Sequence, residues 1–320
     1  MIQDYNTTMQ NVVMEIKKAI NGKDEIIEKI LLALLARGNV LMDDIPGVGK
    51  TTLALAFSKS LSLNYSRMQF TPDVLPSDVV GFNLFNKEKG EFEFKPGAAV
   101  CNLFLADEIN RTSSKTQAAL LEVMEEKQAT VDGVTRKMPE PYMVIATQNP
   151  VGSAGTQMLP ESQLDRFIVR LSMGYPDASG EASILKNRSG KNPLDDVQPC
   201  MNMEDIVRMQ NETDTVFVHD EIYDYIVRLA NATRTHELIK LGISPRGSLA
   251  LTRMAKAHAY LYRRNYVMPD DVMAVFESTV AHRLIISPKA KVTSVSAEAI
   301  IAEILKNTEV PQISGRPDGK

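Results

Sequence analysis

Residues 42–52 read MDDIPGVGKTT and set the expectation for the whole 320-residue chain. A loop that binds nucleotide phosphates is usually written G-x-x-x-x-G-K-[ST], and Gly49, Lys50 and Thr51 match its last three positions. Asp44 stands where that pattern has its first glycine. Aspartate is tolerable there, because backbone at negative φ accepts any side chain and Asp is among the residues most at ease at positive φ. Its carboxylate would repel a phosphate, so we predict that this side chain points away from the nucleotide.

The flanking segments give the loop the context that it needs. NVLMDD (39–44) predicts a short strand, and KTTLALAFSKSL (50–61) predicts a helix. A helix is also predicted over DEIIEKILLALLAR (24–37), with Gly38 as its C-cap. Lys50 would reach the β- and γ-phosphates, and the Thr51 hydroxyl would hold Mg²⁺. The residues expected around the phosphates are Asp44, Pro46, Gly47, Val48, Gly49, Lys50, Thr51 and Thr52.

Strands and helices alternate through the first half of the chain. Further strands are predicted over YSRMQF (65–70), VCNLFLADE (100–108), YMVIATQNP (142–150) and FIVRLSMGYP (167–176), and a helix over SKTQAALLEVMEEK (114–127). This alternation indicates an α/β fold of the P-loop NTPase kind, a parallel sheet with helices on both faces. Ligands of such sheets bind at the carboxyl ends of the strands.

Polar residues stand at two of these strand ends. Asp107 can bind Mg²⁺ or its water shell, and Glu108 beside it can act as the general base for an attacking water. The amide of Asn149 can orient that water and contact the γ-phosphate. The plainer interpretations are a solvated strand end for the Asp-Glu pair and an Asn-Pro turn for Asn149. The phosphate loop that precedes these residues favours the catalytic interpretation.

Two arginines of the first half are candidates for reaching the nucleotide site of a neighbouring subunit. Arg166, in LPESQLDRF, is predicted to act as an arginine finger on a neighbouring subunit. The alternative is an ion pair with Asp165 or Glu161. Arg111, just after the acidic pair, would either reach a neighbour's site or pair with a local acid.

The second half has a different character. Helices are predicted over residues 204–211, 219–234, 244–264, 269–284 and 296–307, without strand alternation between them. We place a domain boundary in SGKNPLDD, which is rich in small and polar residues. The expected organisation is a nucleotide-binding domain over residues 1–190, a smaller all-helical lid domain over 191–312, and a disordered tail over 313–320.

Arg246 is the candidate of the second half. Ser244 resembles an N-cap and Pro245 a first helical residue, so Arg246 would lie in the first turn of a helix. A cation is mildly unfavourable there because of the helix dipole. This slight conflict favours a phosphate-facing role.

Taken together, these strings resemble the MoxR family of AAA+ ATPases. The matching strings are VLMDDIPGVGKTTLA, QFTPDVLPSDVVG, LFLADEINR, KTQAALLEVMEE, TVDG, IATQNP, LPESQLDRF and SPRGSLALTRMAKAHA. The resemblance implies ring-forming ATPases, commonly hexameric, that use ATP and Mg²⁺ and have an α/β nucleotide domain with a helical lid.

The resemblance also assigns roles. It identifies Lys50 and Thr51 as Walker A, Asp107 and Glu108 as Walker B, Asn149 as sensor 1, Arg166 as the arginine finger and Arg246 as sensor 2. The adenine would lie near Ile20, Asn21 and Gly22, where the match is loose. Residues 71–97 would be the insert within helix 2, with a hairpin turning at Lys89-Gly90, and residues 127–141 a hairpin turning at Asp132-Gly133. In related rings such hairpins face the pore or the substrate. The alternative for both is an ordinary surface hairpin.

Composition bounds the remaining possibilities. Apolar residues make up 44% of the chain and charged residues 24%, with a net charge of −4, which is typical of a soluble globular protein and gives no sign of a dedicated nucleic-acid binder. Cys101 and Cys200 are isolated, and His219, His236, His258 and His282 are scattered, so neither a disulfide framework nor a metal cluster is predicted. The first residues lack a signal-peptide pattern and the apolar run at 30–36 is too short to cross a bilayer, so we expect a cytoplasmic protein.

Three functions compete at this point. The first is ATP-driven remodelling or maturation of partner proteins, which the resemblance links to partners with von Willebrand factor A domains. The second is a nucleic-acid motor, for which Lys127, Arg136 and Lys137 offer a modest basic set that nearby acids offset. The third is a nucleotide-binding regulator without hydrolysis, against which the intact catalytic set argues. No base-reading motif separates ATP from GTP.

Overall fold

The computed structural model describes residues 6–45, 47–149, 159–176, 181–182 and 192–312. The chain forms two compact units, Met1–Asn211 and Glu212–Lys320. Pro46 and the predicted tail at 313–320 lie outside the described residues.

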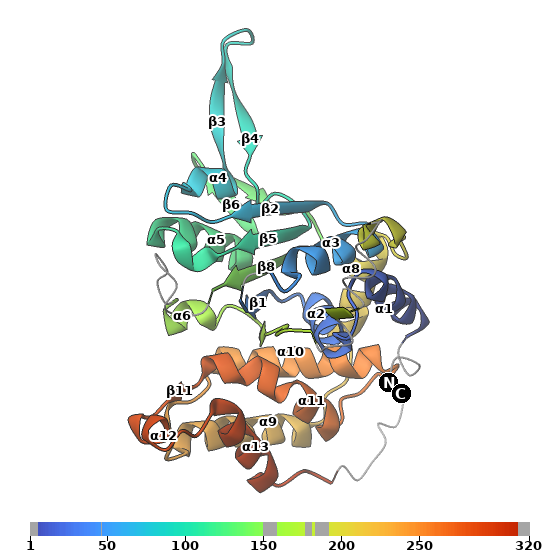
Figure 1. The fold of residues 1–320 in the computed structure, drawn as a ribbon, viewed down its shortest axis with the longest axis vertical. Coiled ribbons are helices and arrows are strands. Elements are labelled where there is room, and N and C mark those ends of the chain that lie inside the picture. The colour runs from blue at the N-terminus through green and yellow to red at the C-terminus, as the bar shows by residue number, and fades with distance from the viewer. Residues whose placement is uncertain (1–5, 46, 150–158, 177–180, 183–191, 313–320) are drawn as a thin grey trace. The chain divides into compact units, whose positions relative to one another are not determined.

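A five-stranded sheet organises the first unit (Figure 1), in the order β2-β5-β8-β1-β9. Its strands are β1 (Val40–Asp43), β2 (Tyr65–Gln69), β5 (Leu103–Asp107), β8 (Met143–Gln148) and β9 (Val169–Leu171). Every neighbouring pair is parallel. The predicted parallel α/β sheet is therefore confirmed, with each of its strands inside the segment expected for it.

Burial along the central strands explains where the polar residues lie. β1, β5 and β8 are buried along their length, and burial decreases only at the last residue, which is Asp43, Asp107 or Gln148. Strands covered by helices on both faces read as continuous apolar runs. A polar side chain at such a strand end therefore marks the edge of the sheet that is open to a ligand.

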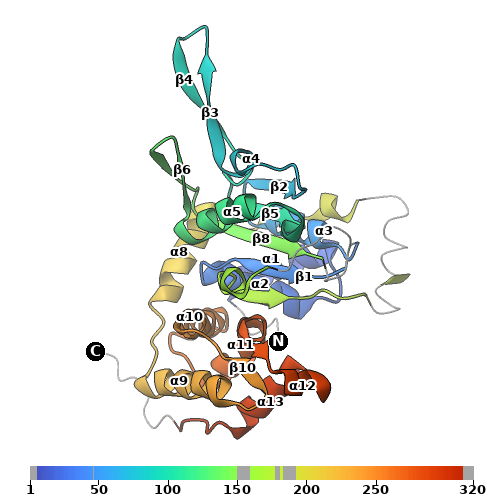
Figure 2. The same ribbon diagram turned by 90° about the vertical axis from the view of Figure 1, so that its left-hand side faces the viewer.

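Helices cover the sheet on both sides (Figures 1 and 2). They are α1 (Thr7–Ala19), α2 (Asp24–Leu35), α3 (Lys50–Ser60) and α5 (Ser114–Glu126). One buried apolar cluster joins Leu41, Phe104 and Val144 of the sheet to Leu120 and Met124 of α5. Helix α1, which the sequence analysis did not predict, buries its apolar face and is capped by the Asn6 side chain.

Two antiparallel hairpins extend from this unit (Figures 1 and 2). The first pairs β3 (Gly81–Asn86) with β4 (Glu91–Pro96) and follows the short helix α4 (Pro76–Val80). The second pairs β6 (Gln128–Val131) with β7 (Val134–Lys137). Gly90, Asp132 and Gly133 all have positive φ, as the tight turns predicted there require.

The segment after residue 191 returns to the first unit. Lys59 Nζ donates to the carbonyl of Leu194 at 2.8 Å, and Gln210 Nε2 donates to the carbonyl of Leu34 at 2.7 Å. These bonds tie the 3-10 turn at Pro193–Asp196 and helix α8 (Met203–Asp214) to α3 and α2. The boundary between the units therefore lies after Asn211, further along the chain than the one predicted near Gly190.

The second unit is mostly helical. It contains α9 (Asp220–Thr235), α10 (Pro245–Leu261), α11 (Pro269–Val280), α12 (Pro288–Val292) and α13 (Ala297–Asn307). The expectation of an all-helical lid needs one correction, because β10 (Ile239–Leu241) pairs antiparallel with β11 (Ile285–Ile286). Strands this short leave no readable alternation in the sequence. Within the described ranges of both units, helices lack the length and apolar character that a bilayer crossing requires.

Candidate nucleotide site

The phosphate loop joins β1 to α3. Gly47 and Gly49 have φ of 86° and 98°, values that L side chains rarely adopt, and Gly49 is the N-cap of α3. A Cβ built on Gly47 meets nothing within 4 Å, so the backbone angle rather than crowding selects glycine there. The amides at the start of α3 and the helix dipole make this end of the helix suited to an anion.

Lysine and threonine side chains of the loop lie at the same end of α3. Lys50 Nζ donates to the carbonyl oxygens of Asp44 at 3.0 Å and Ile45 at 3.4 Å. Val48, Thr51 and Thr52 are half-buried. The lysine ammonium therefore lies against its own loop, within the segment predicted to hold phosphates.

Asp44 directs its carboxylate to the segment after β9. The carboxylate accepts hydrogen bonds from the Ser172 hydroxyl at 2.8 Å and from the backbone N–H groups of Met173 at 2.6 Å and Gly174 at 3.0 Å. Asp44 is only 4% exposed, and these donors compensate the cost of burying its charge. The side chain is thus committed to residues 172–174, as expected of an aspartate that must not face a phosphate.

Asp107 ends β5 and is held from both sides. Thr147 of β8 donates its hydroxyl to one carboxylate oxygen at 2.6 Å. Arg67 of β2 donates to the other at 2.7 Å. The sequence analysis named neither partner, although each lies in a predicted strand. The carboxylate is fixed at the carboxyl edge of the sheet, where a metal ligand is expected.

Glu108 has left-handed backbone, with φ of 58° and ψ of 46°. Its carboxylate accepts from Asn149 Nδ2 at 2.9 Å, Arg111 at 2.8 Å and Gln69 Nε2 at 3.3 Å. Burial alone would raise the pKa of this carboxyl, but the three donors outweigh burial and lower its pKa below the ordinary value. The group is therefore ionised at neutral pH and able to accept a proton. Of the two interpretations of Arg111, pairing with a local acid is the one observed.

Asn149 lies one residue beyond the end of β8 and is 8% exposed. Its side chain donates to the Glu108 carboxylate, so the structure brings together the two residues that we predicted to act on the attacking water. The backbone of Asn149 is held by Asn110, which belongs to the 3-10 turn Ile109–Arg111. Asn110 was missed in the sequence because its partner is 39 residues away.

Arg166 follows the short helix α6 (Glu161–Leu164). It forms an ion pair with Glu125 of α5 at 2.6 Å and donates to the carbonyl of Leu121 at 3.2 Å. The acidic partner is thus Glu125, not one of the two acids offered as the alternative from sequence. The Arg166 side chain as a whole is 32% exposed.

Arg246 belongs to the second unit and lies in the first turn of α10. The Ser244 side chain caps this helix by accepting from the Gly247 N–H at 3.2 Å, and Pro245 is its first residue. Both local predictions are confirmed, and Arg246 is exposed.

The segment predicted near the adenine lies beside the phosphate loop. A Cβ built on Gly49 would lie 3.8 Å from Ile20 Cδ1 and 3.9 Å from Met173 Cε. Gly22 has φ of 72°, and the next residue, Lys23, donates to the carbonyls of Met173 and Tyr175. The chain before α2 and the chain after β9 therefore meet at the phosphate loop, although the sequence match there is loose.

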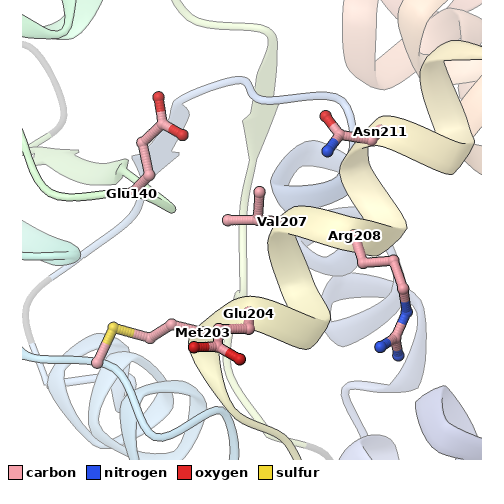
Figure 3. Close-up of a pocket in the computed structure, with 6 residues that line it drawn as sticks. All are labelled: Glu140, Met203, Glu204, Val207, Arg208 and Asn211. Atoms are coloured by element: carbon pink, nitrogen blue, oxygen red, sulfur yellow. The ribbon is translucent and has the colours of Figure 1, made fainter.

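Other candidate groups lie away from this site. Figure 3 shows a pocket between the β7–β8 connection and α8, lined by Glu140, Met203, Glu204, Val207, Arg208 and Asn211. Glu140 precedes the amino end of β8, opposite the edge that carries Asp107. The two cysteines are free thiols, and burial raises the pKa of Cys101 to about 12. In the part of the chain that the structure describes, acids, histidines and cysteines form no cluster of three that would hold a metal by themselves.

Comparison with known proteins agrees with this fold. The pattern of the ATPase family associated with various cellular activities (AAA) matches residues 39–169, and that of the AAA lid domain matches residues 231–304. A crystal structure of a Cytophaga hutchinsonii protein assigned as an ATPase superposes with a TM-score of 0.88 at 35% identity, covering 95% of each chain.

Relatives by sequence span nearly the whole chain. Bacillus subtilis YeaC is 45% identical, over 97% of both chains. Chaperone MoxR1 of Mycobacterium tuberculosis is 37% identical over 97% of this chain and 84% of that protein. Protein MoxR of Methylorubrum extorquens is 28% identical over 90% of both. The chain therefore belongs to the MoxR family of AAA ATPases.

Proposed function

We propose that this protein is a Mg²⁺-dependent ATP hydrolase that works as a hexameric ring and uses ATP to remodel or mature partner proteins. The observation that carries the hydrolytic part is the Glu108 carboxylate, held between Asn149, Arg111 and Gln69 at the edge of the sheet where the phosphate loop also lies. A carboxylate that is ionised and oriented there suits a general base for water.

The residues present fit ATP and its metal. The glycine loop and the first amides of α3 would hold the phosphates, with Lys50 at the β- and γ-phosphates. Thr51 and Asp107 offer the hydroxyl and carboxylate oxygens that Mg²⁺ prefers, the remaining ligands being phosphate and water. When bound, Mg²⁺ would neutralise charge that develops on the phosphates. Ile20 to Gly22 would border the adenine.

Glu108 and Asn149 would both act on the attacking water. Glu108 accepts its proton, while the Asn149 amide orients the water and holds the carboxylate in place. The Glu108–Arg111 ion pair favours the ionised form of the carboxylate and helps to fix its orientation. Arg166 would act on the nucleotide of a neighbouring subunit, so the complete site would form only when subunits assemble. Arg246 would act on a bound γ-phosphate.

The first hairpin supports a protein client. Phe82, Leu84, Phe85 and Phe92 are 44, 51, 49 and 71% exposed, and the rings of Phe85 and Phe92 lie 5.3 Å apart near the hairpin's end. Exposed apolar side chains in one place are typical of an interaction surface. The relative from Mycobacterium tuberculosis carries the name chaperone. A von Willebrand factor A domain adaptor is our proposal for how clients are delivered.

The second hairpin gives less support to a nucleic-acid motor. The Arg136 guanidinium lies 3.9 Å from the Phe94 ring centroid of the first hairpin, so this cation is engaged within the protein. Single-stranded DNA binding that weakens steeply with salt would reverse our preference.

ATP turnover in three variants tests the proposal. Lys50→Ala should lose nucleotide binding, whereas Glu108→Gln should bind ATP and fail to hydrolyse it, because the amide cannot accept the proton. Arg208→Ala, an exposed ion-pair arginine of α8, is the control and should hydrolyse ATP normally. Normal turnover by Glu108→Gln would refute the general base.

A further inference from the structure

Asn39, Asn102 and Asn110 share an unusual environment in the first unit. Asn39 and Asn102 lie at strand ends and Asn110 in the 3-10 turn after β5, and each is almost fully buried, with exposures of 6, 1 and 3%. A buried side-chain amide is costly unless its donor and acceptor are both satisfied. Each of these amides bonds to backbone atoms of a neighbouring segment, so each ties two parts of the chain together.

Asn39 and Asn102 are explained by packing. Asn39 Nδ2 donates to the carbonyl of Met124 at 3.1 Å, and its Oδ1 accepts from the Val144 N–H at 2.9 Å. Asn102 similarly connects the Pro141 carbonyl and the Asn64 N–H, at 2.9 and 3.3 Å. Both lie at the amino ends of strands, the edge opposite the phosphate loop, and each joins two different segments.

Asn110 differs in both respects. It lies at the carboxyl edge, and both of its hydrogen bonds go to one residue: Nδ2 donates to the Asn149 carbonyl at 3.2 Å, and Oδ1 accepts from the Asn149 N–H at 3.3 Å. Two hydrogen bonds to the same residue fix the direction of the Asn149 backbone as well as its position. Asn149 lies beyond β8, so this amide pair holds it where the strand has already ended.

The turn that carries Asn110 is itself braced. Gln117 of α5 is 5% exposed, and its Nε2 donates to the carbonyl of Ile109 at 3.1 Å and that of Thr112 at 3.3 Å. The support therefore runs from α5 through the 3-10 turn to Asn149. From there the Asn149 side chain reaches the Glu108 carboxylate at 2.9 Å.

We propose that Asn110 is a positioning residue for ATP hydrolysis: it fixes the Asn149 backbone so that the Asn149 amide meets Glu108 and the attacking water. The proposal rests on the hydrolytic role of Glu108 proposed above. Asn110 does not touch the reacting atoms. Its removal would leave ATP binding in place and misdirect the amide that orients the water.

Asn110→Ala should lower kcat for ATP by about 10- to 100-fold, by analogy with the loss seen when the hydrogen-bonding partner of a metal ligand is removed. The KM for ATP and the affinity for a fluorescent ATP analogue should change by less than about threefold, because Asn110 makes no contact that would hold ATP in the ground state. Hydrogen exchange of the 143–149 segment should quicken. Asn39→Ala and Asn102→Ala, matched in burial and bond type, should lower thermal stability to a similar extent while kcat stays within about twofold.

A double variant separates positioning from general damage. If Asn110 acts through Asn149, then Asn110→Ala combined with Asn149→Ala should be no slower than Asn149→Ala alone. Should Asn110→Ala fail to fold, Asn110→Ser serves the same comparison. Normal kcat in the Asn110 variant, or losses that multiply in the double variant, would overturn the proposal. If Glu108→Gln is inactive and Asn110→Ala is normal, only the role of Asn110 fails; if Glu108→Gln is active, the proposed hydrolytic site fails instead.

Discussion

The carboxylate of Asp44 accepts a 2.6 Å hydrogen bond from the backbone N–H of Met173. The residue that departs from the glycine pattern thus ties the phosphate loop to the chain that leaves β9. The same chain, through its carbonyls, accepts hydrogen bonds from Lys23, the residue that follows the segment expected at the adenine. Asp44 therefore connects two segments of the candidate nucleotide site and is not a defect in the phosphate loop.

Replacing Asp44 with alanine should therefore destabilise the protein. It leaves two N–H groups and a hydroxyl without their acceptor, at a cost of about 1–3 kcal/mol for a buried group. Urea unfolding measures this loss. Asp43→Ala is the control: this half-exposed carboxylate pairs with Arg170 at 3.9 Å, and its loss should cost less than about 1 kcal/mol. Much weaker ATP binding in the native protein that Asp44→Gly rescues would contradict this account.

Arg166→Ala should lose ATP turnover while ATP binding is retained. An arginine finger contributes roughly a thousandfold or more to phosphoryl transfer. Mixing this variant with Glu108→Gln subunits should restore part of the activity, because each supplies what its neighbour lacks. Turnover of the mixture at several ratios measures this. A fully active monomer would refute action between subunits.

Replacing both Phe85 and Phe92 with serine should abolish client capture and leave basal ATP turnover unchanged. These rings contact each other and solvent, so the sheet and phosphate loop do not depend on them. The measurement is ATP-dependent retention of partner proteins by the Glu108→Gln form, with and without the two changes. Val134→Ser is the control: Val134 is an apolar residue at the turn of the second hairpin whose exposure, 51%, is close to that of Phe85. Undiminished capture by the double variant would exclude this surface.

Acid should selectively weaken the second unit. Asp271 is fully buried; burial opposes its ionisation, but hydrogen bonds from Arg264, His258 and the Met268 N–H outweigh that effect and lower its pKa. A lowered pKa contributes stability above the ordinary Asp value of about 3.9, and this contribution is lost as pH falls through the folded-state value. Asp271→Asn should cost roughly 3–5 kcal/mol at pH 7, because Arg264 loses its charge partner.

The check is unfolding at pH 7 and at progressively lower pH. The difference between wild type and Asp271→Asn should shrink as the solution becomes more acidic than about pH 4. A difference that stays constant with pH would show that ionisation of Asp271 does not stabilise the fold.

Most of the sheet was predictable because its strands are continuous apolar runs that end in polar residues. Helix α1 was missed although its signal was present: Met9, Val12, Val13 and Ile16 fall on one face. Strands β10 and β11 were missed because two or three residues cannot show a period.

Motifs were enough to name the candidate catalytic residues, but not the residues that hold them in place. Arg67 meets Asp107 across 40 positions, Asn110 meets Asn149 across 39, and Arg166 meets Leu121 across 45. Strand order, with β5 between β2 and β8, creates the first two of these meetings. A local sequence pattern indicates that a segment is a strand, but not which strands lie beside it. Such partners can therefore be identified only in the folded structure.

The ribbon formed by β3 and β4 has two open edges, and open edges invite pairing with identical ribbons of other molecules. Charged side chains stand on β4 and the turn, where Glu93 binds Lys89 at 2.6 Å and lies 3.6 Å from Lys95; β3 carries none. Bringing two copies edge to edge would crowd these hydrated charges against one another. Charge thus opposes self-association along the β4 edge, while the exposed phenylalanines of the ribbon stay available to other chains.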